Sequence, residues 1–91
     1  MTQEILQQIT KEIEAWSSEA GVVDPVVLLE RASAPEFGEY SSNVAMRYAK
    51  ELSKSPVELA EELVTFLNEK EIEGLEKAEW VKPGFVNLYF T

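Results

Sequence analysis

Two runs of strand-forming residues, 77–82 and 85–90, flank the dipeptide Pro83-Gly84 near the end of the chain. Proline and glycine together favour a tight turn. Runs rich in β-branched and aromatic residues on both sides of such a turn predict an antiparallel hairpin. A hairpin must bury one of its faces against another layer of secondary structure. The rest of the chain is therefore expected to supply that layer.

The second run of the hairpin has two different faces, because successive side chains of a strand point to opposite sides of the sheet. One face is apolar and consists of Val86, Leu88 and Phe90. The other face combines two aromatic rings with an amide and consists of Phe85, Asn87 and Tyr89. We expect the apolar face to lie against helices and the second face to be open to solvent.

An open sheet face with aromatic rings and an amide is a known kind of platform for unpaired nucleic-acid bases. Aromatic rings stack on bases, and an amide offers a donor and an acceptor to a base edge. Bases in RNA loops are recognised in this way. Two alternatives stay open. Aromatic residues are favoured in strands for packing reasons, and an exposed aromatic face can instead contact another protein or a second copy of the chain.

The preceding part of the chain contains helical patterns separated by strand and turn signals. Apolar residues recur at spacings of three and four near the start, and Ser55-Pro56-Val57-Glu58 is a capping box with proline at the first helical position. Ser41 or Ser42 is the expected cap of an earlier helix. The predicted elements are a helix at 3–20, a strand at 26–33, a turn at 34–38, a short strand at 39–41, and helices at 43–53 and 56–70.

This order of elements predicts an α+β fold: helix, two strands, helices, two strands. Strands joined by short turns pair antiparallel, so we expect a two-layer sandwich with a mainly antiparallel sheet of about four strands and helices on one face. The 91 residues suit a single domain covering 1–91. The sequence stops one residue after an apolar strand residue, and we expect it to be truncated from a longer enzyme.

The composition excludes several kinds of chemistry. The chain has no histidine and no cysteine, which removes Ser-His triads, thiolate metal sites and disulfides. Most of its 17 acidic residues are glutamates on predicted helical faces, where a solvated role is expected. The sequence therefore predicts no catalytic residues and no metal site. It also has no apolar run of 18 residues, so we expect a cytoplasmic protein without a membrane partner.

The formal net charge of −9 argues against DNA binding or any generic nucleic-acid binding, because phosphate contacts need lysine and arginine. The charge is uneven, however, and segments 40–57 and 80–91 each carry more bases than acids. Within 40–57 three bases share one helical face and are candidates for phosphate contact: Arg47, Lys50 and Lys54. Solvation of this face, or pairing of Arg47 with Glu51, is the alternative. Lys82 is the base of the second segment.

Several motifs, dispersed in order over almost the whole chain, resemble the N-terminal additional domain of arginyl-tRNA synthetase. The residues that carry the resemblance are Phe37-Gly38-Glu39-Tyr40-Ser41-Ser42-Asn43, Ala45-Met46-Arg47-Tyr48-Ala49-Lys50, Pro56-Val57-Glu58-Leu59-Ala60 and Gly84-Phe85-Val86-Asn87. The family fold implied by this resemblance is a two-layer α+β domain, in line with the predicted order of elements.

The resemblance also implies a function. In that family the domain precedes the catalytic domain and contacts the D-loop corner of tRNA(Arg), and the aromatic residue and amide of the closing strand hold a loop nucleotide. These two residues match Phe85 and Asn87. Tyr89, Lys82 and the basic face of 40–57 are further candidates from pattern. The parent enzyme would use ATP and arginine, whereas this chain lacks the histidines of the synthetase motif and is expected to be neither an enzyme nor a cofactor binder.

Overall fold

The computed structural model describes residues 2–91, which form three α-helices, one short 3-10 helix and a four-stranded sheet. In chain order the elements are α1 (Thr2–Ala20), β1 (Leu29–Arg31), η1 (Pro35–Phe37), β2 (Tyr40–Ser42), α2 (Val44–Leu52), α3 (Pro56–Lys70), β3 (Leu75–Val81) and β4 (Phe85–Phe90). The predicted α+β class and the predicted order of helices and strands are confirmed.

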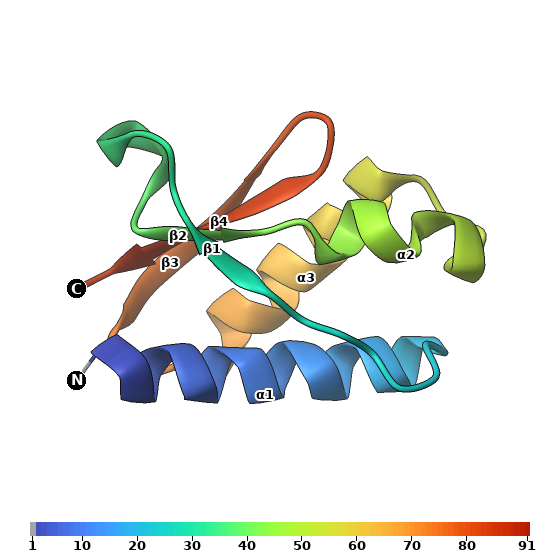
Figure 1. The fold of residues 1–91 in the computed structure, drawn as a ribbon, viewed down its shortest axis with the longest axis horizontal. Coiled ribbons are helices and arrows are strands. Elements are labelled where there is room, and N and C mark those ends of the chain that lie inside the picture. Colours follow the sequence, from blue (N-terminus) through green and yellow to red (C-terminus); the bar gives the residue numbers. More distant parts are fainter. Residues whose placement is uncertain (1) are drawn as a thin grey trace.

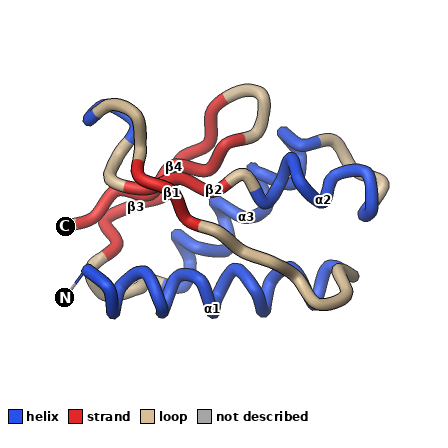
Figure 2. Tube along the Cα trace, viewed as in Figure 1, coloured by secondary structure: helices blue, strands red, loops and turns tan. Residues whose placement is uncertain are grey.

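The four strands of the described chain are ordered β1-β2-β4-β3, and all neighbours are antiparallel. The hairpin of β3 and β4 was predicted, and its turn is closed by a hydrogen bond from the Gly84 N–H to the Val81 carbonyl, 2.9 Å. β4 also pairs with β2, with Asn87 opposite Ser41. β4 is therefore an inner strand of the sheet. In Figure 2 the four strands, in red, lie close together above α1.

The helices cover one face of the sheet, and the core lies between the two layers (Figure 1). On β4, Val86 and Leu88 are fully buried in that core, as the alternation of side chains predicts. The core residues of the helices recur at spacings of three and four, and they include Ile9, Ile13, Leu59, Leu63 and Leu67. The opposite face of β4 is consequently turned away from the helices.

The starts of α3 and α2 test two cap signals predicted from the sequence, and only the first is confirmed, because the N-cap of α2 is neither Ser41 nor Ser42. The Ser55 hydroxyl accepts a hydrogen bond from the Glu58 N–H at 3.0 Å, which confirms Ser55 as the N-cap of α3. At α2 the N-cap position is Asn43, and its side chain makes no capping bond within the described chain. The Ser42 hydroxyl accepts instead from the Val44 N–H at 3.2 Å, so Ser42 assists the helix start from the end of β2.

The strand predicted at 26–33 was too long, because β1 spans only Leu29–Arg31. Val26 bonds to a side chain in place of a neighbouring strand: its N–H donates to the Tyr48 hydroxyl at 2.7 Å, and that hydroxyl donates to the Val26 carbonyl at 3.4 Å. The aliphatic residues of this segment favour a strand locally, but a tertiary contact with α2 determines its conformation.

β3 is longer than predicted and begins at Leu75, with an irregular register between Leu75 and Lys77. The buried residue Ala78 bonds to an α3 side chain through both of its backbone groups. Its N–H donates to Asn68 Oδ1 at 2.8 Å, and its carbonyl accepts from Asn68 Nδ2 at 3.1 Å. β3 is an edge strand of the sheet, and exposed backbone N–H and carbonyl groups on an edge strand can pair with another chain. The bonds to Asn68 occupy two of these groups at Ala78.

Ser17 gives a first testable prediction. Its side chain is fully buried in α1, and its hydroxyl has no hydrogen-bond partner among residues 2–91. Burying a hydroxyl without a partner costs about 1–3 kcal/mol, and alanine is the better helix former. Ser17→Ala is therefore expected to raise the free energy of unfolding by about 1 kcal/mol, or the thermal midpoint by roughly 4–8 °C.

Circular dichroism during heating measures this change. Ser18→Ala, at the exposed neighbouring position of α1, controls for helix propensity. A lower midpoint for Ser17→Ala would show that the hydroxyl has a stabilising partner in solution.

Among residues 2–91, no helix combines the length and apolar content that crossing a lipid bilayer requires.

Candidate nucleic-acid interface

The face of the sheet turned away from the helices carries a cavity of about 350 Å³. Strand and loop residues line this cavity, and we call it the β4 pocket: Ala32, Ser33, Phe37, Ser41, Val81, Lys82, Phe85 and Asn87. Its volume falls in the range of sites for small ligands. In Figure 1 the η1 segment and the β3–β4 turn both rise on the side of the sheet opposite α1, apart from each other.

β4 positions two predicted site residues, Phe85 and Asn87, on the predicted face, but their exposures differ. Phe85 is 39% exposed, whereas Asn87 is only 3% exposed, so the expectation of an amide open to solvent was wrong. The physical reason is the segment 32–38, which folds over this face of the sheet: the Glu36 carbonyl accepts from the Tyr89 hydroxyl at 2.7 Å. Ala32, Ser33 and Phe37 of this segment line the same cavity as Asn87, on the side of the sheet away from the helices.

The buried amide of Asn87 is chemically unusual because it is not fully satisfied. Its Nδ2 has no hydrogen-bond partner within the described residues. A buried amide donor without a partner costs free energy of the order of 1–3 kcal/mol. An unpaired buried group of this kind calls for a partner that the described residues do not supply, such as an ordered water or a ligand.

Tyr89 does not form the open aromatic surface that was expected. Its ring is partly buried, and the Lys77 ammonium lies over it at 4.9 Å from the ring centroid. Burial raises the pKa of the Tyr89 phenol, and the nearby Glu79 carboxylate raises it further, so the hydroxyl stays protonated and can donate to Glu36. Tyr89 therefore attaches the η1 segment to β4 and does not line the β4 pocket.

The predicted basic residues are exposed but are distributed over two places. Lys82 lines the β4 pocket at the hairpin turn. On α2 the Arg47 guanidinium stacks over the Tyr48 ring at 5.8 Å, and Lys50 is exposed. Lys54 Nζ lies 3.0 Å from Glu62 Oε2 in an exposed ion pair, which a phosphate would have to replace.

Phe37 is a pocket residue that the sequence reasoning missed. It lies in η1, and 39% of it is exposed. The sequence treats this segment as a turn, since Pro35 and Gly38 flank the aromatic residue. An aromatic residue inside a predicted surface turn was the available signal.

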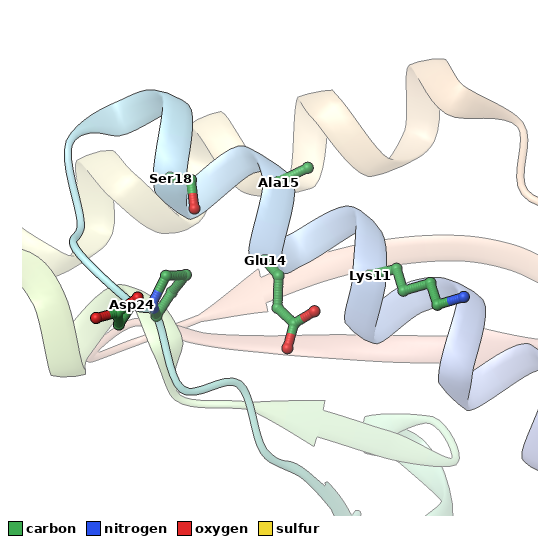
Figure 3. Close-up of a pocket in the computed structure, with 6 residues that line it drawn as sticks. Lys11, Glu14, Ala15, Ser18 and Asp24 are labelled. Carbon is green, nitrogen blue, oxygen red and sulfur yellow. The ribbon is translucent and has the colours of Figure 1, made fainter.

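A second surface depression lies between α1 and the loop that follows it, and Figure 3 shows its lining residues. The charged side chains Lys11, Glu14 and Asp24 spread along this groove and do not converge. In residues 2–91 no group of three or more histidine, cysteine, aspartate or glutamate residues could hold a metal ion. The groove therefore does not have the convergent polar groups of a binding site.

Comparison with known proteins identifies the family of this domain. The family model "Arginyl tRNA synthetase N terminal domain" matches residues 3–90. The chain belongs to the arginyl-tRNA synthetase N-terminal domain family. It is similar to the arginine–tRNA ligases of Chromobacterium violaceum (38% identity, 96% of this chain, 15% of the relative) and Methanococcus aeolicus (34% identity, 98% of this chain, 15% of the relative).

The fold of the family is the fold seen here. The solved structure of the Thermus thermophilus arginyl-tRNA synthetase matches 93% of this chain with a TM-score of 0.72 and 30% identity, and the match covers 14% of that synthetase. Among the curated relatives compared, the chain spans between 10% and 16% of the relative's length. The arginyl-tRNA synthetase N-terminal domain is thus a small part of much longer relatives.

Proposed function

We propose that this domain binds the D-loop corner of tRNA(Arg) and holds one unpaired base of that loop in the β4 pocket. The observation that carries the proposal is the buried residue Asn87, which lines a cavity beside the exposed Phe85 ring and whose Nδ2 lacks a partner in the described chain. A base would stack on Phe85 and offer an acceptor to Asn87.

The basic residues are proposed to contact the RNA backbone next to that base. Lys82 lines the pocket. The hairpin turn that carries Lys82 lies close to α2: a Cβ added at Gly84 would be only 3.0 Å from Met46 Cγ. Arg47 and Lys50 are exposed on α2, and we propose that they extend the contact to the RNA backbone. Lys54 contributes after its ion pair with Glu62 opens.

The domain is proposed to act in the cytoplasm as part of an arginine–tRNA ligase, whose catalytic domain uses ATP and arginine. It would position the tRNA for that catalytic domain and would itself bind neither cofactor. With a net charge of −9 the domain is repelled by RNA at long range. We therefore expect the isolated chain to bind RNA with a Kd weaker than about 10 μM.

Chemical-shift mapping of the isotope-labelled chain with a D-arm RNA hairpin tests the proposal. We expect shifts to cluster on residues 82–87 and on α2. In the alternative, in which the aromatic face contacts protein, RNA would leave these residues unshifted and the chain would self-associate in sedimentation experiments.

Asn87→Leu provides a sharper test, because binding and stability are expected to change in opposite directions. Leucine has the same number of side-chain heavy atoms as asparagine, branched at the same carbon, and removes the unpaired amide, so the thermal midpoint should be unchanged or higher. RNA affinity should fall roughly tenfold, since the donor to the base is lost. A variant that is destabilised and still binds RNA would show that Asn87 has a structural role.

A further inference from the structure

We infer that Phe37 is the second aromatic wall of the β4 pocket, so that a base is stacked between Phe37 and Phe85 and does not lie on one open ring. This inference rests on the proposed function and adds a residue that determines base specificity. Both rings line the cavity, and both are 39% exposed. They come from separate segments, η1 and the β3–β4 hairpin, which Figure 1 shows apart from each other on the side of the sheet opposite α1.

Hydrogen bonds to β4 hold the segment that carries the Phe37 ring. The Tyr89 hydroxyl donates to the Glu36 carbonyl at 2.7 Å, and the Glu39 N–H donates to the Leu88 carbonyl at 2.9 Å. The Glu39 carboxylate also accepts from the Phe90 N–H at 2.6 Å. These three bonds flank Phe37 on both sides in sequence and tie its segment to β4. Ordering a surface segment costs conformational entropy, so three bonds that hold an exposed ring at a cavity favour a binding role.

Two walls and an amide select a particular chemistry. An aromatic ring on each side of the cavity favours a flat, aromatic ligand that can stack on both of its faces. The unpaired Asn87 Nδ2 favours a ligand with an acceptor on its edge. An unpaired nucleobase of an RNA loop meets both conditions. A sugar–phosphate backbone without a base meets neither.

The experiment uses D-arm RNA hairpins that are identical except at one loop position, which carries each of the four bases or an abasic residue. Affinities are measured for the wild-type chain and for Phe37→Leu, which keeps apolar volume without an aromatic face, and Phe37→Tyr, which keeps the ring. Val23→Ala alters an exposed apolar residue outside the pocket and is the matched control.

Phe37→Leu is expected to bind base-containing hairpins roughly tenfold more weakly than the wild type, equivalent to about 1.4 kcal/mol. Its affinity for the abasic hairpin should be unchanged. Phe37→Tyr and Val23→Ala should bind as the wild type does. The same thermal midpoint for Phe37→Leu and wild type will show that folding is intact.

The outcomes separate this inference from the function on which it rests. If Phe85→Ala and Asn87→Leu abolish the preference for a base but Phe37→Leu does not, Phe37 is not a wall of the site and the proposed function stands. If the wild-type chain binds base-containing and abasic hairpins equally, the pocket does not hold a base, and both proposals are overturned.

Discussion

Gly38→Ala is expected to lower the free energy of unfolding by about 3 kcal/mol and to abolish base-dependent RNA binding. Gly38 has φ = +86°, a conformation that residues with a side chain rarely adopt. A Cβ at this position would lie 2.5 Å from the Leu88 carbonyl oxygen, which belongs to the backbone of an inner strand and cannot move without disturbing the sheet. The strain can be relieved by detachment of the η1 segment from β4.

The two ways of accommodating the alanine have different results, and the loss of base-dependent binding follows from the second. If the segment stays attached, the strain is stored in the domain and the thermal midpoint falls by roughly 12–24 °C. If it detaches, Phe37 leaves the pocket and the Asn87 amide becomes open to water. Thermal unfolding and the hairpin affinities measure the two effects, and amide hydrogen exchange at residues 36–39 distinguishes them.

A matched control for this substitution is available in the same segment. Glu36→Ala removes an exposed side chain but keeps the carbonyl that accepts from Tyr89. It should leave stability and RNA affinity close to those of the wild type. A Gly38→Ala domain with wild-type stability and base preference would contradict the close approach of η1 to β4.

The sequence predicts the parts of this fold that depend on local patterns. The N-cap at Ser55, the turn at Pro83-Gly84 and the burial of Val86 and Leu88 on β4 are read from neighbouring residues, and each is present in the structure. The strand predicted at 26–33 failed where a distant residue intervened, because the Tyr48 hydroxyl bonds to Val26. Local propensity gives no information about that contact.

In the candidate site, too, features that depend on neighbouring residues were predicted, and features that depend on distant contacts were not. Alternation predicted the face of Asn87 correctly, but its burial depends on a segment that arrives from η1. The bond from Tyr89 to Glu36 that holds this segment joins residues 53 apart in sequence, and no local pattern announces it. For this reason Tyr89 was expected at the surface, and Phe37 was not recognised as a pocket residue.

The β4 pocket therefore depends on two close backbone approaches, one for each wall. Gly38 brings the η1 segment against β4 on one side. On the other side Gly84, in the turn that precedes Phe85, packs against the start of α3 and against α2. The distance between the Phe37 and Phe85 rings depends on how closely η1 packs on β4 and how closely the hairpin turn packs on the helices. A side chain added at Gly38 or Gly84 should therefore alter the pocket.

Gly84→Ala is expected to lower the free energy of unfolding by about 2–3 kcal/mol and the thermal midpoint by roughly 10 °C or more. Gly84 is buried and has φ = +151°. A Cβ there would lie 2.9 Å from Pro56 Cβ and 3.0 Å from Met46 Cγ. Met46 has a flexible side chain that can turn away, whereas the Pro56 ring is rigid and fixed at the first turn of α3. The hairpin turn must therefore move away from the helices.

The place of the disturbance separates this variant from Gly38→Ala. Chemical-shift changes in Gly84→Ala should be largest at residues 44–47, 55–58 and 81–86, with η1 little affected. Affinity for base-containing hairpins should also fall, because the moved turn carries Lys82 and Phe85. Met46→Ala in the same chain should restore little stability if Pro56 is the main obstacle. Recovery of most of the lost stability would instead identify Met46 as the residue that limits the approach of the hairpin to α2.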